Sequence, residues 1–189
     1  MLLRILRGIE SRCRNIYYLL SGVKLHGYVW MGKLDIPRNF NAIELEAQSS
    51  LDHGVTLLCS GDEISKPKIF IGANTYINRN TFIDASLSVR IGRQCGIGPG
   101  CYITDHDHGM QTNLPPLEQP LVSKPTYIGD RVWIGANATI LKGVTIGDDA
   151  VIGAGSVVTK SIPAGAIAVG NPARIIKFKP GFQTSYSIS

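Results

Sequence analysis

The chain has 189 residues, of which 17% are charged, and its formal net charge is +5. This length allows one domain with a core of its own, and the composition excludes a disordered chain and a general nucleic-acid-binding surface. The four cysteines form no CxxC pair, and the N-terminus lacks the uninterrupted apolar run of a signal peptide or a membrane span. We therefore expect a single cytoplasmic domain without disulfides and without a nucleic-acid partner.

Residues 1–28 are predicted to form an N-terminal helical segment, because apolar residues recur at helical spacing between Leu2 and Leu20. Arginines, among them Arg7 and Arg14, lie on another side of this amphipathic helix. Its basic side could contact an anionic membrane or a partner, which would place the protein at the inner face of the membrane. Alternatively, the helix could pack on its own domain. The sequence leaves both interpretations open.

A six-residue repeat dominates the rest of the chain. Aliphatic residues recur in two blocks, and glycine follows most of them; the positions are Ile71, Ile77, Ile83, Ile91, Ile97, Ile103, Ile128, Ile134, Ile140, Ile146, Ile152 and Val158. This period fits neither an α-helix nor a lone strand. It is typical of a parallel β-helix, in which each hexapeptide makes one short strand and a turn, and three hexapeptides make one coil. The sequence thus predicts an all-β prism with the aliphatic residues stacked inside.

A second inward position is expected two residues before each aliphatic residue, and it should hold a small side chain. The residues there are Thr75, Thr81, Cys95, Cys101, Val132, Ala138, Val144, Ala150 and Ser156. Two of the four cysteines therefore have a packing role. The repeated glycines are expected to serve corners that need positive φ or a close approach of backbones. They specify the fold and do not indicate a phosphate-binding loop.

We expect the β-helix domain to cover residues 29–177, with irregular first coils between Val29 and Ile69. A C-terminal tail over residues 178–189 is expected to be frayed from Gly181 onward. One protruding loop, residues 104–127, interrupts the repeat.

The protruding loop is the expected place for chemistry. It separates Ile103 from Ile128, after which the repeat resumes, and it contains His106 and His108. Long loops on a rigid scaffold often carry function, and a neutral imidazole can accept a hydroxyl proton near physiological pH. Either histidine could be such a general base; the alternative is that both are solvated loop residues.

Two motifs identify the family that the chain resembles. They are YIGDRVWIGANATILKGVTIGDDAVIGAGSVVTKSIP at residues 127–163 and VGNPARII at residues 169–176. In these motifs, and over about residues 69–177, the chain resembles the hexapeptide-repeat acyltransferases, particularly the galactoside, maltose and polysaccharide O-acetyltransferases. The resemblance implies a left-handed β-helix and a homotrimer with active sites between neighbouring subunits. It also implies acetyl transfer from acetyl-CoA, without a metal, to a hydroxyl of a sugar or of a polysaccharide or lipopolysaccharide precursor.

The same resemblance assigns a base and an acceptor site. Thr104, Asp105 and His106 match the segment that holds the family's catalytic histidine, so His106 is the expected base and His108 the second choice. Asn78 lies in a Tyr-x-Asn-x-Asn stretch that matches the family's acceptor-contacting segment. The resemblance therefore implies that Asn78 and, more weakly, the nearby Asp84 contact the acceptor; alone, an asparagine there would be read as a turn residue.

The family match also assigns residues along coenzyme A. These are Trp133, Ala136, Ala154, Thr159, Lys160 and Arg174. Trp133 is expected to wall off the thioester or to lie in a trimer contact. Lys160 and Arg174 also suit the phosphates of the cofactor on physical grounds.

Three other functions remain to be compared with this one. A serine or nucleotide-sugar N-acyltransferase on the same prism would take an amine acceptor. A zinc carbonic anhydrase of this fold needs three histidines around an open metal position, whereas His26 and His53 are expected outside the regular coils. A non-catalytic trimeric scaffold would have no need for the set of site residues named above. Acetyl-CoA-dependent O-acetyl transfer is therefore the expected function.

Overall fold

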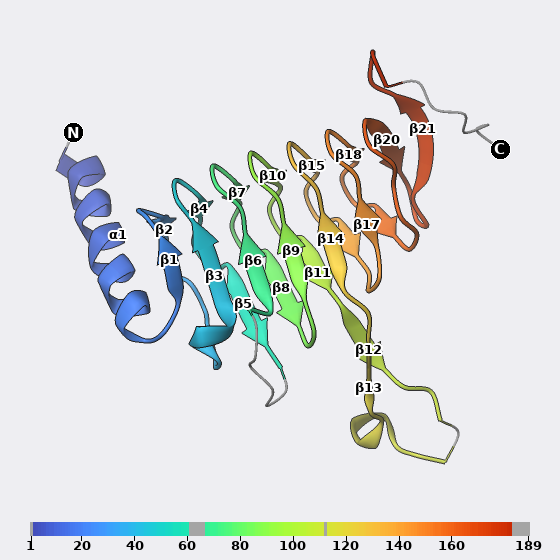
Figure 1. The fold of residues 1–189 in the computed structure, drawn as a ribbon, viewed down its shortest axis with the longest axis horizontal. Coiled ribbons are helices and arrows are strands. Elements are labelled where there is room, and N and C mark those ends of the chain that lie inside the picture. Colours follow the sequence, from blue (N-terminus) through green and yellow to red (C-terminus); the bar gives the residue numbers. More distant parts are fainter. Residues whose placement is uncertain (1, 61–66, 112, 183–189) are drawn as a thin grey trace.

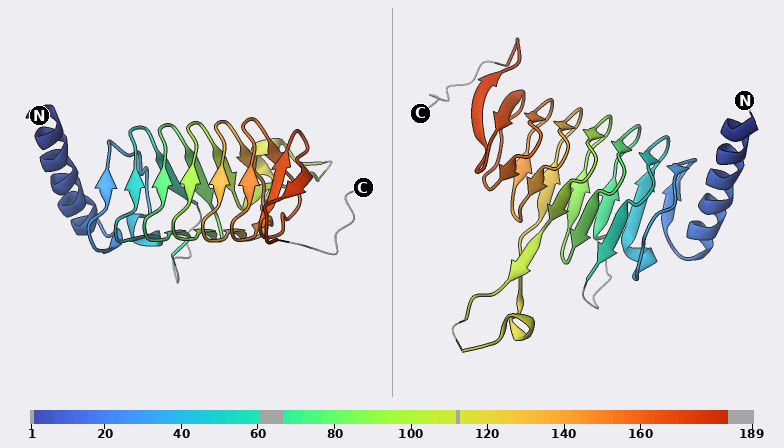
Figure 2. Two further views of the ribbon diagram at one scale, coloured as in Figure 1. Left: turned by 90° about the horizontal axis from the view of Figure 1, so that it is seen from above. Right: turned by 180° about the vertical axis from the view of Figure 1, so that it is seen from behind.

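The computed structural model describes residues 2–60, 67–111 and 113–182. One helix, α1 (Leu2–Leu20), lies across the end of a three-sided prism built from short strands (Figure 1). Viewed from above, successive coils stack regularly along the prism axis (Figure 2). Each full coil contributes one strand to each of three sheets, and the prism is a left-handed parallel β-helix. The predicted fold and the predicted N-terminal helix are confirmed.

Each face of the prism is one sheet. Face A holds β1 (Lys24–His26), β3 (Ile43–Glu46), β6 (Ile69–Ile71), β9 (Val89–Ile91), β14 (Thr126–Ile128) and β17 (Thr145–Ile146). Face B holds β2 (Trp30–Met31), β4 (Ser50–Leu51), β7 (Tyr76–Ile77), β10 (Gly96–Ile97), β15 (Trp133–Ile134), β18 (Val151–Ile152), β20 (Ala166–Val169) and β21 (Arg174–Phe178). Face C holds β5 (Thr56–Cys59), β8 (Phe82–Ala85), β11 (Tyr102–Thr104), β16 (Thr139–Ile140) and β19 (Val157–Val158). The corners between faces B and C form the B–C edge, and those between faces C and A form the C–A edge.

The core is the stacked aliphatic column that the repeat predicts. Ile71 pairs in register with Ile91, Ile91 with Ile128, and Ile128 with Ile146, and all four side chains are buried. The nine small inward positions predicted from the sequence are also buried. Because neighbouring strands lie about 4.8 Å apart, each layer of side chains packs directly on the next.

The glycines that follow the aliphatic residues are required for close approach. A Cβ atom on Gly135 would lie 2.5 Å from the backbone nitrogen of Ala154 in the next coil, which no real Cβ atom tolerates. Positive φ occurs elsewhere in the corners, often at asparagines such as Asn80 and Asn137. Asparagine enters this left-handed region more readily than most residues, so glycine is not obligatory there.

The prism begins earlier and more regularly than the sequence indicated. β1 pairs in parallel with β3, so face A starts at Lys24, ahead of the boundary predicted at residue 29. The stretch predicted to be irregular contains β2 to β5 and a short 3₁₀ helix, η1 (Phe40–Ala42). His26 and His53 therefore belong to the coils. At the other end β21 pairs antiparallel with β20, and residues 183–189 of the predicted tail lie outside the described residues.

Helix α1 packs on the prism through a polar stripe. Ser11 Oγ accepts the backbone N–H of Met31 at 2.9 Å, and Asn15 Oδ1 accepts that of Val29 at 3.1 Å. Arg14 donates to the carbonyl oxygen of Met31 at 3.1 Å, and Tyr18 is buried. These bonds satisfy the open edge of face B, which would otherwise expose unpaired backbone groups.

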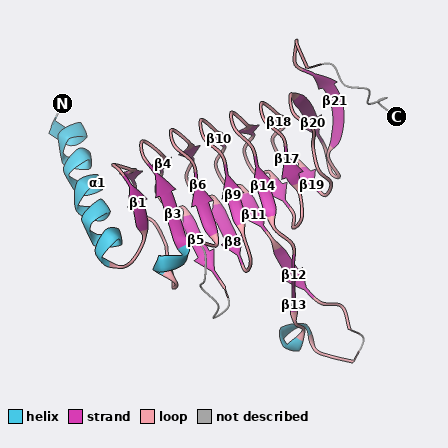
Figure 3. Cartoon of the chain, viewed as in Figure 1, coloured by secondary structure: helices cyan, strands magenta, loops and turns pink. Residues whose placement is uncertain are grey.

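The predicted loop forms an arm with structure of its own. β12 (His106–His108) pairs antiparallel with β13 (Leu121–Ser123), and η2 (Pro116–Glu118) lies toward the tip (Figure 3). At the base of the arm Thr126 Oγ1 donates to the carbonyl oxygen of Thr104 at 2.8 Å, and the backbone N–H of Lys124 donates to that of Asp105 at 2.7 Å. The first residue of the arm is thus fixed to the prism.

Candidate functional site

His106 lies where the arm leaves the C–A edge. β11 ends at Thr104 in register with Asp84 of β8, and two residues later His106 begins β12. Its side chain is only 10% exposed, although its neighbours in β12 are open to solvent. The histidine that the sequence singled out is therefore held against the prism, whereas His108 is exposed on the arm.

A buried carboxylate orients this imidazole. Asp105 is fully buried, and its Oδ1 lies 2.9 Å from Nδ1 of His106. The same carboxylate accepts backbone N–H groups from the preceding coil: Ser86 at 2.8 Å, Leu87 at 2.7 Å, and Ser88. Since backbone N–H groups can only donate, both carboxylate oxygens act as acceptors, and Nδ1 must carry a proton to pair with Asp105. In the neutral ring this leaves Nε2 as a proton acceptor.

Asp84 lies on the other side of the ring. Its Oδ2 is 3.7 Å from Nε2 of His106 and 3.4 Å from the hydroxyl of Tyr102. Its buried Oδ1 has no hydrogen-bond partner among the described residues. Burial raises the pKa of Asp84, and the opposing pull of His106 is the smaller effect. The free nitrogen of an oriented imidazole beside Oδ2 of a partly exposed carboxylate is a suitable place for a ligand hydroxyl, whereas the buried Oδ1 is closed off by the chain.

The structure brings only part of the predicted set to His106. Asp84 is adjacent, and Thr159 and Lys160 lie on the same C–A edge, exposed, where the chain leaves β19. Asn78 instead occupies the B–C edge after β7, where its Oδ1 accepts the backbone N–H of Arg79. The width of face C separates Asn78 from His106 within one chain.

The other predicted cofactor residues are on the far side of face C. Ala136 and Ala154 lie on the B–C edge, one coil apart, and Arg174 is exposed on β21. Trp133 points outward from face B with its side chain 62% exposed, and its register partner in the preceding coil is Gly96. The predicted residues thus form two separate groups on one prism.

Sequence reasoning did not assign a role to several residues around His106. The sequence indicates Asp105 only as the neighbour of His106, and it contains no signal for Tyr102 or Lys142. Lys142 contacts the carboxylate of Asp107 and the carbonyl oxygen of Val122, so it ties both strands of the arm to the prism. An aspartate directly before a histidine at the start of a loop is a usable signal, but its backbone partners could not be read from the sequence.

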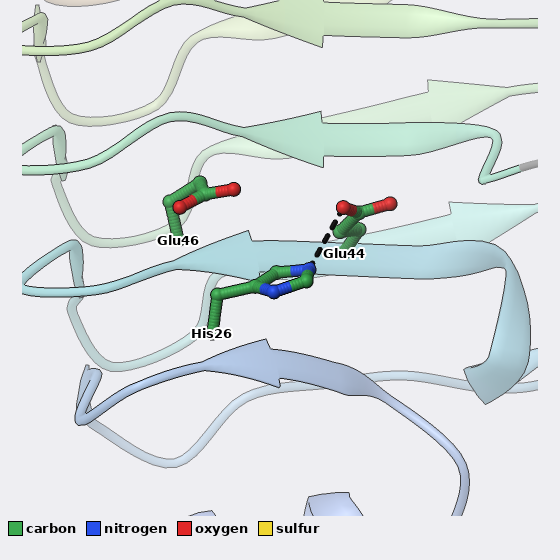
Figure 4. Close-up of side chains that lie close together, drawn as sticks. All are labelled: His26, Glu44 and Glu46. Carbon is green, nitrogen blue, oxygen red and sulfur yellow. Dashed lines mark hydrogen bonds and ion pairs between the residues drawn. The ribbon is translucent and has the colours of Figure 1, made fainter.

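One group of side chains elsewhere has the composition of a metal site. His26, Glu44 and Glu46 project from adjacent strands of face A, and Nε2 of His26 lies 2.8 Å from Oε1 of Glu44 (Figure 4). Their ligand atoms fall within 4.8 Å of one another. The group is partly solvated and contains one histidine, whereas the carbonic anhydrase alternative requires three.

The fold and the repeat define a hexapeptide-repeat protein, and the comparisons agree. The sequence model described as "Bacterial transferase hexapeptide (six repeats)" matches residues 125–160. Galactoside O-acetyltransferase of Escherichia coli (strain K12) is 42% identical over 109 residues, covering 58% of this chain and 53% of that protein. In three further curated relatives the match spans 63%, 50% and 56% of their own lengths, so the chain corresponds to only part of each.

Two solved structures are also similar. A hexapeptide-repeat-containing acetyltransferase of Vibrio cholerae is 31% identical, with a TM-score of 0.60 over 70% of this chain and 71% of that one. A galactoside acetyltransferase solved in complex with coenzyme A is 30% identical, with a TM-score of 0.61 over 82% of this chain and 64% of that one. The chain belongs to the hexapeptide-repeat acetyltransferases.

Proposed function

We propose that this protein transfers an acetyl group from acetyl-CoA to a hydroxyl of a saccharide acceptor, with His106 as the general base. The observation that carries the proposal is the orientation of His106 by Asp105, which leaves Nε2 free beside Asp84. Family membership supports the acetyl donor, because a similar galactoside acetyltransferase was solved with coenzyme A. A polysaccharide or lipopolysaccharide precursor is the acceptor class that we favour.

In the proposed reaction Nε2 of His106 takes the proton of the acceptor hydroxyl. The oxygen attacks the thioester carbonyl carbon, the carbon–sulfur bond breaks, and His106 returns the proton to the departing thiolate. Asp105 holds the ring in the required tautomer, and Oδ2 of Asp84, which faces Nε2, accepts a hydrogen bond from the acceptor. No acyl-enzyme intermediate is required.

We further propose a homotrimer whose sites lie between subunits. Support comes from the separation of the predicted residues, since one chain holds His106, Thr159 and Lys160 on one edge and Asn78, Ala136 and Ala154 on another. An exposed tryptophan on a flat sheet face also favours burial by a second subunit. In that arrangement Trp133 walls off the thioester, and Lys160 and Arg174 bind phosphates of coenzyme A.

A cavity lined by Arg79 and Asn80, the two residues after Asn78, supports acceptor binding at this edge. A space of about 510 Å³ opens between α1 and the B–C edge, and Arg7, Trp30 and Arg79 are among its lining residues. This volume is within the range of small-molecule sites, and the aromatic ring and charged donors suit a polar saccharide. We place the protein in the cytoplasm, where its free cysteines would stay reduced.

The test is coenzyme A release from acetyl-CoA across mono-, oligo- and nucleotide-linked sugars and free serine. Wild type is compared with His106→Ala, and His108→Ala is the matched control. We expect release with a sugar hydroxyl, a loss of about a hundredfold or more in His106→Ala, and near-normal turnover in His108→Ala. Release only with serine or an amino sugar would replace the proposal by an N-acyltransferase. Absence of coenzyme A binding would favour a scaffold.

A further inference from the structure

Helix α1 packs on its own domain with the side that a soluble amphipathic helix normally exposes. Ser11 and Tyr18 are buried against the first coil, and Asn15 and Arg14 bond to its backbone. Polar atoms are needed there, because the first strand of face B offers free N–H and C=O groups at the end of the prism. The apolar side of the helix therefore faces away from the domain.

That outward side is a continuous apolar stripe. Its large side chains are 47% to 82% exposed; they are Ile5, Leu6, Ile9, Ile16, Tyr17, Leu19 and Leu20. Ile5, Ile9, Ile16 and Leu20 follow one another at helical spacing, which places them on one line along the helix. Scattered exposed apolar residues are ordinary, whereas a contiguous stripe of this size marks a contact surface.

The charge of this end of the chain indicates what covers the stripe. Residues 1–38 contain seven basic and two acidic side chains and so account for the net charge of +5; Arg14 bonds to the prism, whereas Arg12, four residues before Ile16, is exposed at the border of the stripe. Arg12 lies over the ring of Tyr28, 5.4 Å from its centroid, and the rings of Tyr28 and of Tyr17 in the stripe are exposed. Exposed aromatic rings and arginines next to an apolar stripe are typical of helices that lie in a membrane interface. Two copies meeting through this surface would instead bring like charges together.

The position of α1 at the end of the molecule leaves its exposed side accessible to a flat surface such as a bilayer. α1 forms one extremity of the molecule, and no other described element lies beyond it (Figures 1 and 2). Within the described part of the chain, no helix is long and apolar enough to cross a membrane. The stripe can therefore lie on a bilayer along its whole length while the prism extends away from it.

We propose that α1 seats this end of the protein on an anionic lipid bilayer through its apolar stripe, with the exposed basic side chains of this end, Arg12 among them, bound to the headgroups. The polar stripe holds the helix to the prism, so the domain follows the helix to the surface. The expected association is peripheral and reversible, since it combines a modest apolar area with electrostatic attraction. This inference stands apart from acetyl transfer.

The test is flotation of the purified chain with vesicles of phosphatidylglycerol and phosphatidylethanolamine, compared with phosphatidylcholine vesicles. We expect binding to the anionic vesicles that weakens with salt, and a loss of about tenfold or more in an Ile9→Glu/Ile16→Glu variant. Both side chains are exposed, so the variant should fold, which circular dichroism would verify. Ile176→Glu, an equally exposed isoleucine on β21, is the matched control and should bind as wild type.

Three results would overturn the proposal. The first is no flotation of the wild type with either vesicle. The second is equal binding by the wild type and the Ile9→Glu/Ile16→Glu variant. The third is a smaller oligomer for that variant in light scattering, which would assign the stripe to contacts between copies of the chain.

Discussion

Asp105 and His106 are adjacent in sequence, and Oδ1 of the first lies 2.9 Å from Nδ1 of the second. The same buried carboxylate is bonded to the backbone of Ser86 and Leu87 in the coil before. One side chain thus connects the orientation of the candidate base to the corner of the prism that the arm leaves. A substitution at Asp105 should therefore alter both the stability of the fold and the tautomer and orientation of His106.

Asp105→Asn should produce both effects, and each can be measured independently. An amide offers one acceptor oxygen and a donor group, so at least one buried backbone N–H loses its partner, and we expect the free energy of unfolding to fall by about 3 kcal/mol. Denaturant titration measures this. The nitrogen chemical shifts of His106 should also show loss of the Nδ1–H form, a change that a purely structural role would not produce. An unchanged tautomer would remove Asp105 from the proposed mechanism.

Asp84 should make stability depend on pH in a direction opposite to that of an ordinary paired carboxylate. Burial raises its pKa, so the folded chain holds the proton more tightly than the unfolded chain. Its stabilising effect is therefore present in acid and is lost as the pH rises from the ordinary value of 3.8 through the raised pKa of the folded state.

The measurement is the unfolding free energy of wild type and Asp84→Asn across this pH range. Because asparagine does not titrate, the difference, wild type minus variant, reports Asp84; it should fall as the pH rises and level off once Asp84 is ionised in both the folded and the unfolded chain. A difference that rises with pH would mean that His106 stabilises the Asp84 carboxylate more than burial destabilises it.

Thiol reactivity should follow burial. Cys13 is exposed, whereas Cys59, Cys95 and Cys101 are buried, and burial raises the pKa of each of these three thiols, that of Cys59 to about 12. Because the thiolate is the reactive form, Ellman's reagent should label Cys13 alone in the native protein and all four cysteines in guanidinium. Cys13→Ser should abolish native labelling. Rapid native reaction of a second thiol would contradict the packing role predicted for Cys95 and Cys101.

The sequence was sufficient to predict the parts of the fold that follow from the six-residue repeat. The aliphatic column and the small inward residues, Cys95 and Cys101 included, follow from six-residue spacing, which leaves each strand one register. The sequence did not reveal the hydrogen bonds to the Asp105 carboxylate. The donors are backbone N–H groups of residues 86–88, which come close to Asp105 only after the chain has completed one coil. The sequence also did not predict which side of α1 packs on the prism. An amphipathic helix usually packs through its apolar side, but here the unpaired backbone groups at the open edge of face B require the polar side.

Mixed trimers provide the sharpest test of the proposed arrangement of sites. Asn78 and His106 lie on opposite edges of face C, so one chain alone does not place both against one acceptor. If each site combines His106 of one subunit with Asn78 of the next, His106→Ala and Asn78→Ala should each be inactive as pure proteins. After co-refolding at equal ratio, random assortment should restore about a quarter of the sites. A His106→Ala/Asn78→Ala double variant co-refolded with His106→Ala is the control and should stay inactive. Lack of recovery in the first mixture, with light scattering showing trimers, would contradict a site that combines His106 of one subunit with Asn78 of the next.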